Sequence, residues 1–361
     1  MNMNSSVFRS VSLLAFGLAA LSASAAGTNY HVTDIGSFGG QSVTATSINN
    51  AGQVVGYGQD ASHHIKSYIY QGGVMTNMGS LSTTQDIYAM QINESGTAAG
   101  YGYVPFAQGQ IHAFTYAGGT KTQLSGTGTR SGAVALNDNG QVLGTLQVGA
   151  GPNQTVVWTS GVATVQAGLS GTANGINNAG QIAGYRSTGG GFGAYVYSAG
   201  VTSNIPTLGG TSNVTAAINN AGQVVGQSTL AGNTNTHAFL YSGGVAKDLG
   251  ALNPTDFSYA NGLNEFGKVV GTSSTQAGVY SAFYYDGTSM INLNQHLDAS
   301  SVGWTLSEAT SINDLGQIVG YGMIGGQQHA FLLTPLAAPE PGTFAALGLG
   351  ALVVLKRRRK A

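Results

Sequence analysis

The 361-residue sequence has no cysteine and little charge, with Asp, Glu, Lys and Arg together making up only 7%. The lack of cysteine excludes a disulfide framework and any thiolate chemistry. The two ends hold six of the twelve basic residues but only one of the thirteen acidic residues, so the region between them carries a charge near −6. Because a nucleic-acid-binding surface needs a basic patch, this composition argues against a nucleic-acid partner.

Common catalytic motifs are also missing. The sequence has no Gly-x-Ser-x-Gly, no His-Glu-x-x-His, no P-loop and no Asp-x-Asp-x-Asp-Gly calcium loop. The adjacent pair His63-His64 invites a metal site, but solvated loop histidines are the simpler interpretation. We therefore predict no catalytic residue, no metal and no cofactor.

What the sequence does contain is a repeat. A turn of the form Asn-x-x-Gly, followed by a short strand-like stretch that ends in Gly, occurs seven times at intervals of 40 to 49 residues. The copies begin at Asn49, Asn93, Asn137, Asn177, Asn219, Asn264 and Asn313. A period of this length indicates a repeat architecture and outweighs the two-domain expectation from length alone.

Each copy predicts four short strands, best seen between residues 214 and 250. Strands at 214–219 and 223–226 flank the Asn-x-x-Gly hairpin turn, and strands at 237–241 and 245–250 flank a Ser-Gly-Gly turn. Aromatic residues two apart on the third strand share one face. We expect them to fill the space between neighbouring sheets.

Four strands in about 44 residues is the period of a propeller blade. The sequence therefore predicts an all-β protein, a β-propeller of seven four-stranded blades. The last copy stops after its third strand at 329–333, whereas residues 30–36 resemble an isolated fourth strand. We expect this N-terminal strand to complete the last blade, because closure removes exposed sheet edges. A linear stack of sheets is the alternative.

The Ile-Asn-x-x-Gly-Gln-Val-Val-Gly block, the His-Ala-Phe block and the Asp-Leu-Gly block together resemble the HAF repeat of bacterial extracellular proteins. The resemblance spans residues 30 to 334, although the third and fourth copies lack the His-Ala-Phe wording. The family implies an exported repeat protein without a settled activity.

The N-terminus has the layout of a secretory signal peptide. Arg9 precedes an apolar run from Val11 to Leu21, and Ala23 and Ala25 form an Ala-x-Ala cleavage site. We predict a signal peptide at 1–25, outside the fold, with a buried N-terminal helix as the alternative. The repeat domain is then predicted at 26–336.

The C-terminal residues 337–361 also form a pattern. Pro339, Glu340 and Pro341 precede an apolar stretch at 342–355, and a basic cluster containing Arg357, Arg358 and Arg359 follows. The stretch is shorter than the roughly 20 residues of a full span, yet it predicts a membrane-entering helix with its basic end in the cytoplasm.

This order resembles the PEP-CTERM sorting signal of Gram-negative bacteria. The resemblance implies an exosortase-type processing enzyme as partner, transient anchoring in the membrane, and delivery to the cell surface or extracellular matrix. A plain tail anchor is the alternative.

Loop lengths distinguish the two faces of the predicted ring. Connections between second and third strands, and between copies, vary widely, whereas the other turns hardly vary. Recognition commonly resides on such variable loops; neutral drift is the alternative. If this face holds a pocket, Arg186, Asp256, His296 and Trp304 are the candidate binding residues, with Trp304 suited to stacking on a sugar ring.

The repeated polar residues favour structural roles. His112, His237 and His329 share one third-strand position, where we expect each to bond a neighbouring backbone group. Acidic residues replace Asn in the second turn position in four copies, where turn propensity explains them better than calcium does. These residues are Glu94, Asp138, Glu265 and Asp314.

Function is predicted only by class. A surface rich in Asn, Gln, Ser, Thr and Gly, together with the sorting tail, favours a non-catalytic protein that binds or organises extracellular polysaccharide, as in a biofilm. The alternatives are a propeller-type polysaccharide lyase or glycosidase, and a purely structural surface protein.

Overall fold

The structure, a computed structural model, describes residues 29–79, 86–103, 111–124, 130–274, 277–299 and 301–336. They belong to one compact unit, Asn29–Ala337. The fold is all-β, as predicted, with two short 3-10 helices in this part of the chain, η1 (Ala231–Asn233) and η2 (Leu293–Gln295).

The predictions for the two ends lie outside the described residues. These are the signal peptide with Ala23 and Ala25, the apolar C-terminal helix, and the sorting residues Pro339, Glu340, Pro341, Arg357, Arg358 and Arg359.

Each copy of the repeat contributes consecutive antiparallel strands. The first strands are β2 (Gly39–Ile48), β6 (Ile87–Ile92), β10 (Arg130–Leu136), β14 (Thr172–Ile176), β18 (Gly209–Ile218), β22 (Phe257–Leu263) and β26 (Thr305–Ile312). The second strands are β3 (Val54–Asp60), β7 (Ala98–Tyr103), β11 (Val142–Gln147), β15 (Ile182–Ser187), β19 (Val224–Leu230), β23 (Val269–Ser274) and β27 (Ile318–Ile324).

The remaining strands follow the same order. The third strands are β4 (Ile65–Gln71), β8 (Ile111–Ala117), β12 (Asn153–Thr159), β16 (Phe192–Ser198), β20 (Thr236–Ser242), β24 (Tyr280–Tyr285) and β28 (Gln327–Pro335). The fourth strands are β5 (Val74–Asn77), β9 (Thr120–Gln123), β13 (Val162–Val165), β17 (Val201–Asn204), β21 (Val245–Asp248) and β25 (Met290–Asn292). One further strand, β1 (Tyr30–Gly36), precedes the first copy.

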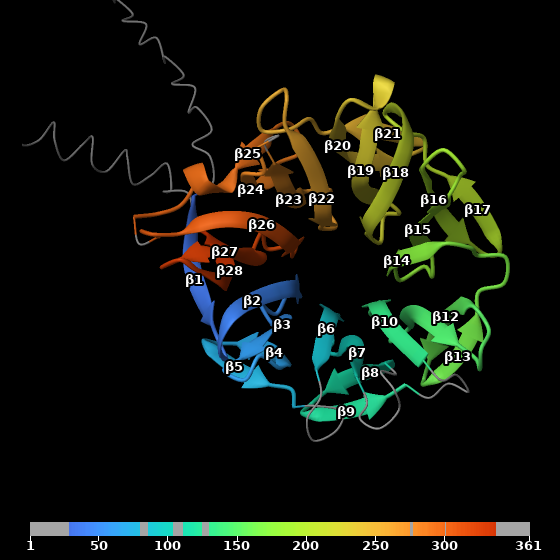
Figure 1. Ribbon diagram of the computed structural model, residues 1–361, viewed down its shortest axis with the longest axis horizontal. Coiled ribbons are helices and arrows are strands. Elements are labelled where there is room, and N and C mark those ends of the chain that lie inside the picture. Colours follow the sequence, from blue (N-terminus) through green and yellow to red (C-terminus); the bar gives the residue numbers. More distant parts are fainter. Residues whose placement is uncertain are drawn as a thin grey trace, which may run out of the picture. The chain divides into compact units, whose positions relative to one another are not determined.

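Hydrogen bonding groups the strands of the described residues into five four-stranded sheets and one eight-stranded sheet. The larger sheet contains β26–β27–β28 and β2–β5, which are linked by a single parallel pair between Ser42 and Gln328. Strand β1 pairs antiparallel with β28, with Tyr30 opposite Pro335. The first strands face the centre of the arrangement and the fourth strands face outward, which makes the fold β-propeller-like (Figure 1).

The leading Asn of each turn explains why the turn sequence recurs. In the fifth copy, the Asn219 side-chain oxygen accepts a hydrogen bond from the Gln223 backbone N–H, and its Nδ2 donates to the Asn264 carbonyl of the next copy. The same donation to the next turn is made by Asn49, Asn93, Asn137, Asn177, Asn264 and, back to the carbonyl of Asn49, by Asn313. All seven Asn side chains are nearly buried, so each satisfies buried backbone groups that would otherwise lack partners.

The second turn position also links neighbouring copies, through an acceptor side chain. The Glu94 backbone N–H donates to Asp138 Oδ1, and the Asp138 N–H donates to Asn178 Oδ1. The Asp314 N–H likewise donates to Asn50 Oδ1. Asn, Asp and Glu interchange at this position because each offers an oxygen acceptor.

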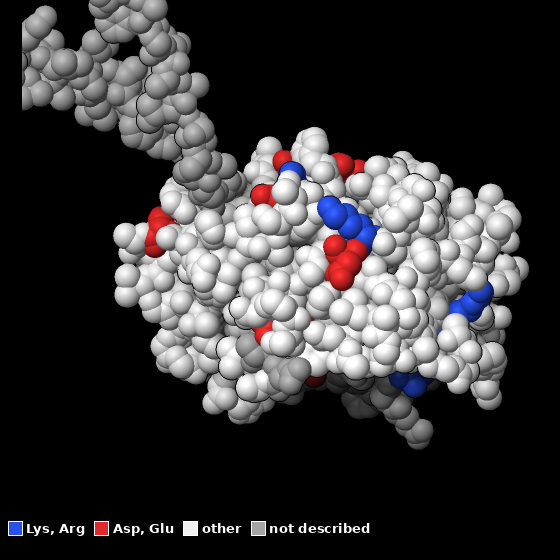
Figure 2. All heavy atoms as spheres, turned by 90° about the horizontal axis from the view of Figure 1, so that it is seen from above, with Lys and Arg blue, Asp and Glu red and all other residues white. Residues whose placement is uncertain are grey.

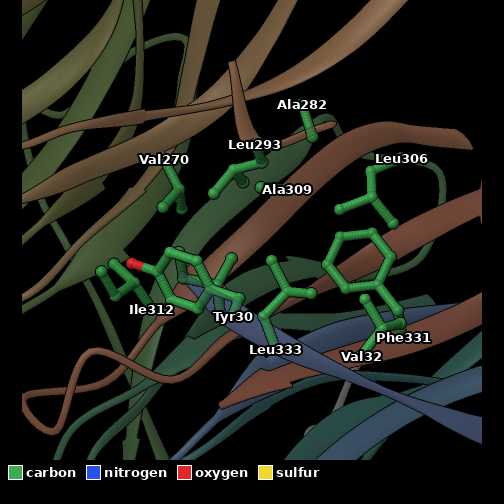
Figure 3. Packing of buried hydrophobic residues seen from close by; sticks show 11 residues of the cluster. Tyr30, Val32, Val270, Ala282, Leu293, Leu306, Ala309, Ile312, Phe331 and Leu333 are labelled. Carbon is green, nitrogen blue, oxygen red and sulfur yellow. The ribbon is translucent and has the colours of Figure 1, made fainter. Parts of the chain in front are cut away.

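Third-strand aromatics and aliphatic residues form the core between neighbouring sheets. Phe239 on β20 is fully buried and packs in one cluster with Ala183 from the preceding copy. At the junction of the two chain ends, Tyr30 and Val32 of β1 pack with Phe331 and Leu333 of β28 and with residues of β26 (Figure 3). The N-terminal strand is therefore part of a hydrophobic core formed largely by the C-terminal copies.

Candidate binding site

The repeated third-strand histidines are bonded to side chains of the neighbouring outer strand. His237 Nδ1 lies 3.0 Å from Asp248 Oδ1, and His329 Nδ1 lies 2.9 Å from Asp34 Oδ2. His112 Nδ1 lies 3.1 Å from Gln123 Nε2. These partners are side chains, which corrects the expectation of a backbone partner.

The sixth copy lacks the His–Asp pair that the fifth and seventh copies contain. Its third strand reads Ser281-Ala282-Phe283, so Ser281 occupies the position of the histidine, and Asn292 on β25 occupies that of the acid. Asn292 still accepts from the backbone N–H two residues on, as Asp248 does, so the local turn is preserved. The smaller serine leaves space that an imidazole fills in the fifth copy.

A cavity of about 440 Å³ lies at this place. Its walls come from the β21–β22 connection, from the facing ends of β23 and β24, and from β25 with the residues that follow it. The lining residues are Leu252, Asn253, Asp256, Ser273, Val279, Ser281, Met290, Ile291, Asn292, Gln295 and His296. The volume is typical of a small-molecule site.

The polar wall is held by hydrogen bonds. Asp256 is 6% exposed and accepts from Asn253 Nδ2 at 2.8 Å through its Oδ2. The Ser273 hydroxyl accepts from the Leu252 backbone N–H and donates to a backbone carbonyl. The His296 carbonyl accepts from the backbone N–H of Tyr30, which is itself buried. These contacts position the polar groups before any ligand arrives.

The chemistry of the lining is mixed. Amide, hydroxyl and imidazole groups lie beside the apolar side chains of Leu252, Met290 and Ile291. Among the described residues that line the cavity, Asp256 alone carries a carboxylate. Such a site provides hydrogen bonds for hydroxyl groups and an apolar surface for carbon–hydrogen faces.

The four predicted binding residues are divided by the structure. Asp256 and His296 line the same cavity. Arg186 lies on β15, where its Nη2 donates to Asn204 Oδ1 at 2.9 Å and its guanidinium lies 5.9 Å from the Tyr195 ring centroid. Trp304 packs edge-on against Phe331 with centroids 6.3 Å apart. Neither Arg186 nor Trp304 lines the cavity.

The residues that open the cavity, Ser281 and Asn292, were missed at the sequence level. Their signal was visible as a departure from the repeat, since Ser-Ala-Phe stands where neighbouring copies have His-Ala-Phe.

Among the described residues there is no group of three or more His, Asp or Glu arranged to hold a metal ion. In the same part of the chain, no helix has the length and apolar character needed to cross a bilayer.

Comparison with known proteins supports the sorting tail and the fold. The PEP-CTERM protein-sorting motif matches residues 337–360, which marks the chain as an exported protein that an exosortase recognises and processes for the cell surface. No curated protein matches the chain.

Solved structures are similar in fold but distant in sequence. A puromycin-hydrolysing peptidase of Mycobacterium tuberculosis is 11% identical with a TM-score of 0.52, over 86% of this chain and 55% of that one. TolB from Acinetobacter baumannii is 13% identical with a TM-score of 0.45, over 83% of this chain and 65% of that one. The chain thus spans less than two thirds of either protein, and the likeness to the peptidase concerns the fold alone.

Proposed function

We propose that this protein binds extracellular polysaccharide without catalysis, through the cavity beside Ser281. The observation that carries the proposal is the cavity itself, which lies where Ser281 and Asn292 stand in place of the His–acid pair of the fifth and seventh copies. Sugar rings present hydroxyl groups at their edges and apolar faces, and the cavity offers partners for both. The surface supports a neutral ligand, because charged atoms are few on the face in Figure 2.

Binding is favoured over glycoside hydrolysis by the carboxylate content of the site. Glycosidases ordinarily use two carboxyl groups about 5 to 10 Å apart. The described lining offers only that of Asp256.

The proposal includes a cellular setting. A Gram-negative bacterium exports the chain, removes the signal peptide at Ala25, anchors the protein transiently through the tail, and releases it to a surface or biofilm matrix. The sorting motif at 337–360 supports this route. The His-Ala-Phe blocks support assignment to the HAF-repeat proteins.

We further propose a ring of seven blades, in which the eight-stranded sheet is two blades and β1 completes the last. Two observations support it. Contacts between first strands run from β2 through β6, β10, β14, β18 and β22 to β26, and β26 contacts β2. The Asn313 side chain also bonds the Asn49 carbonyl, in the same way as every other neighbouring pair of turns.

A cavity-filling variant tests the binding site. The double substitution Ser281→His with Asn292→Asp restores the pair that the fifth copy accommodates, so the fold should remain stable. Gln154→His is a matched control, because Gln154 holds the same third-strand position outside the cavity.

Binding of the host's own exopolysaccharide is measured by calorimetry and by retention on immobilised polymer. We expect the double variant to lose binding at least about tenfold and the control to match the wild type. Unchanged binding by the double variant, or no retention of the wild type, would overturn the proposal.

A further inference from the structure

A group of tyrosines lies away from the cavity, on first and second strands. The rings of Tyr57 and Tyr88 are 5.0 Å apart in an edge-to-face arrangement, and Tyr88 stacks on Tyr101 at 5.1 Å. Tyr57, Tyr101 and Tyr321 each follow the glycine that ends the repeated turn-and-strand block. Tyr57, Tyr88, Tyr101 and Tyr321 are all partly exposed, so the group is open to solvent.

Glu308 is hydrogen-bonded to one of these tyrosines, Tyr321. The Tyr321 hydroxyl donates to Glu308 Oε2 at 2.8 Å, and Asn261 Nδ2 donates to Oε1 at 3.1 Å. Both donors are neutral, and no Lys, Arg or His of the described residues forms an ion pair with this carboxylate. Burial raises the pKa of Glu308, while the hydrogen bond from Tyr321 acts in the opposite direction.

Strand register brings the group together. Glu308 lies opposite Tyr321, Thr44 opposite Tyr57, and Tyr88 opposite Tyr101. These pairs occupy the same register position in three sets of strands whose first strands, β26, β2 and β6, contact one another in that order. Burial, and secondarily the negative charge of Glu308, raises the pKa of Tyr57.

We propose that Tyr57, Tyr88, Tyr101 and Tyr321, together with Glu308, bind an organic ammonium group. Aromatic faces attract such cations, and aromatic cages recognise alkylated ammonium ions. The carboxylate supplies the opposite charge that the described protein groups leave uncompensated. An ionised carboxylate accepts about four hydrogen bonds, so two donors leave capacity for a ligand.

The ammonium has two chemical sources, an amino sugar of a polysaccharide or a free small amine of the choline type. This site is separate from the cavity beside Ser281, so the inference does not rest on the proposed function. Affinity should fall as pH falls through the raised pKa of Glu308, because protonation removes the attracting charge.

The test titrates the purified full chain with tetramethylammonium, choline and a protonated glucosamine oligosaccharide, followed by calorimetry and tyrosine fluorescence. The neutral isostere 3,3-dimethylbutan-1-ol controls for shape. We expect the cations to bind at least about tenfold more tightly than the neutral alcohol. Whichever of choline and the glucosamine oligosaccharide binds more tightly identifies the source of the ammonium group.

Three variants locate the site. Glu308→Gln keeps an acceptor for Tyr321 but removes the charge, and should weaken cation binding about tenfold or more. Tyr57→Leu should also weaken it. Tyr185→Leu is the matched control, because Tyr185 has the same register position as Tyr57 and also lies opposite a threonine, Thr172, but its ring packs on Phe192 in the fourth copy. It should bind as the wild type does.

Equal affinity for the alcohol, or full binding by both Glu308→Gln and Tyr57→Leu, would overturn the inference. The cavity-filling double variant should bind ammonium normally. Failure of one site is therefore distinguishable from failure of the other.

Discussion

His329 Nδ1 lies 2.9 Å from Asp34 Oδ2, although the two residues are 295 positions apart in the chain. The pair repeats the arrangement of His237 and Asp248, which belong to one copy of the repeat. An interaction that is local in the fifth copy thus joins the two ends of the repeat region through β28 and β1. The two pairs form a natural comparison between a local contact and one made across the whole fold.

The first prediction concerns this contact. Asp34→Ala should lower the free energy of unfolding by about 0.5–1 kcal/mol, because the pair is partly exposed. Hydrogen exchange should rise in both β1 and β28. Asp248→Ala is the control, which should accelerate exchange in β21 and leave β1 unchanged. If β1 exchanges as slowly in Asp34→Ala as in the wild type, the His329–Asp34 pair does not hold this strand in place.

The second prediction concerns the glycine that ends each turn-and-strand block. A Cβ at Gly226 would lie 2.0 Å from the Val214 carbonyl oxygen, where the first strand bulges between Thr215 and Ala217. Gly226→Ala should therefore cost about 3 kcal/mol, measured by urea denaturation. Gly190→Ala, where a Cβ meets nothing within 4 Å, should change the stability by less than about 0.5 kcal/mol. Similar effects of the two substitutions would contradict the clash.

The third prediction concerns pH. The pKa of Glu308 is raised from 4.5 in the folded protein, chiefly by burial. Between 4.5 and that higher value the folded state binds more protons than the unfolded state, so stability falls as pH rises through this window. Glu308→Gln should remove that slope and raise stability at neutral pH by up to about 1 kcal/mol, allowing for partial exposure.

Denaturant midpoints measured between pH 4 and pH 8 check this expectation. Glu265→Gln, at an exposed turn position, serves as the control and should keep the wild-type slope. A Glu308→Gln variant that is less stable at neutral pH would show that the ionised carboxylate stabilises the fold. A carboxylate kept at a cost to stability is consistent with a binding role.

The all-β, propeller-like architecture was predictable because residues close together in the sequence define each repeat. Asn and Gly define each turn, and alternating aromatics define each third strand. The grouping of the candidate binding residues was not predictable. Asp256 and His296 line one cavity, but no local signal tells whether an arginine such as Arg186 or a tryptophan such as Trp304 turns toward it. Side-chain direction depends on partners such as Asn204 and Phe331 from other strands.

The sequence by itself determined the repeat, the type and order of the strands, and the sorting motif, since each depends on residues close together in the chain. Only the tertiary structure decided which departures from the repeat matter. Ser281 leaves a cavity open because residues from three parts of the chain surround the space that a histidine side chain would fill. Glu308 and the tyrosines of the first two copies come to the same part of the fold because β26 and β2, more than 200 positions apart, pack side by side. Such contacts are set by packing between distant segments, and no local pattern records them.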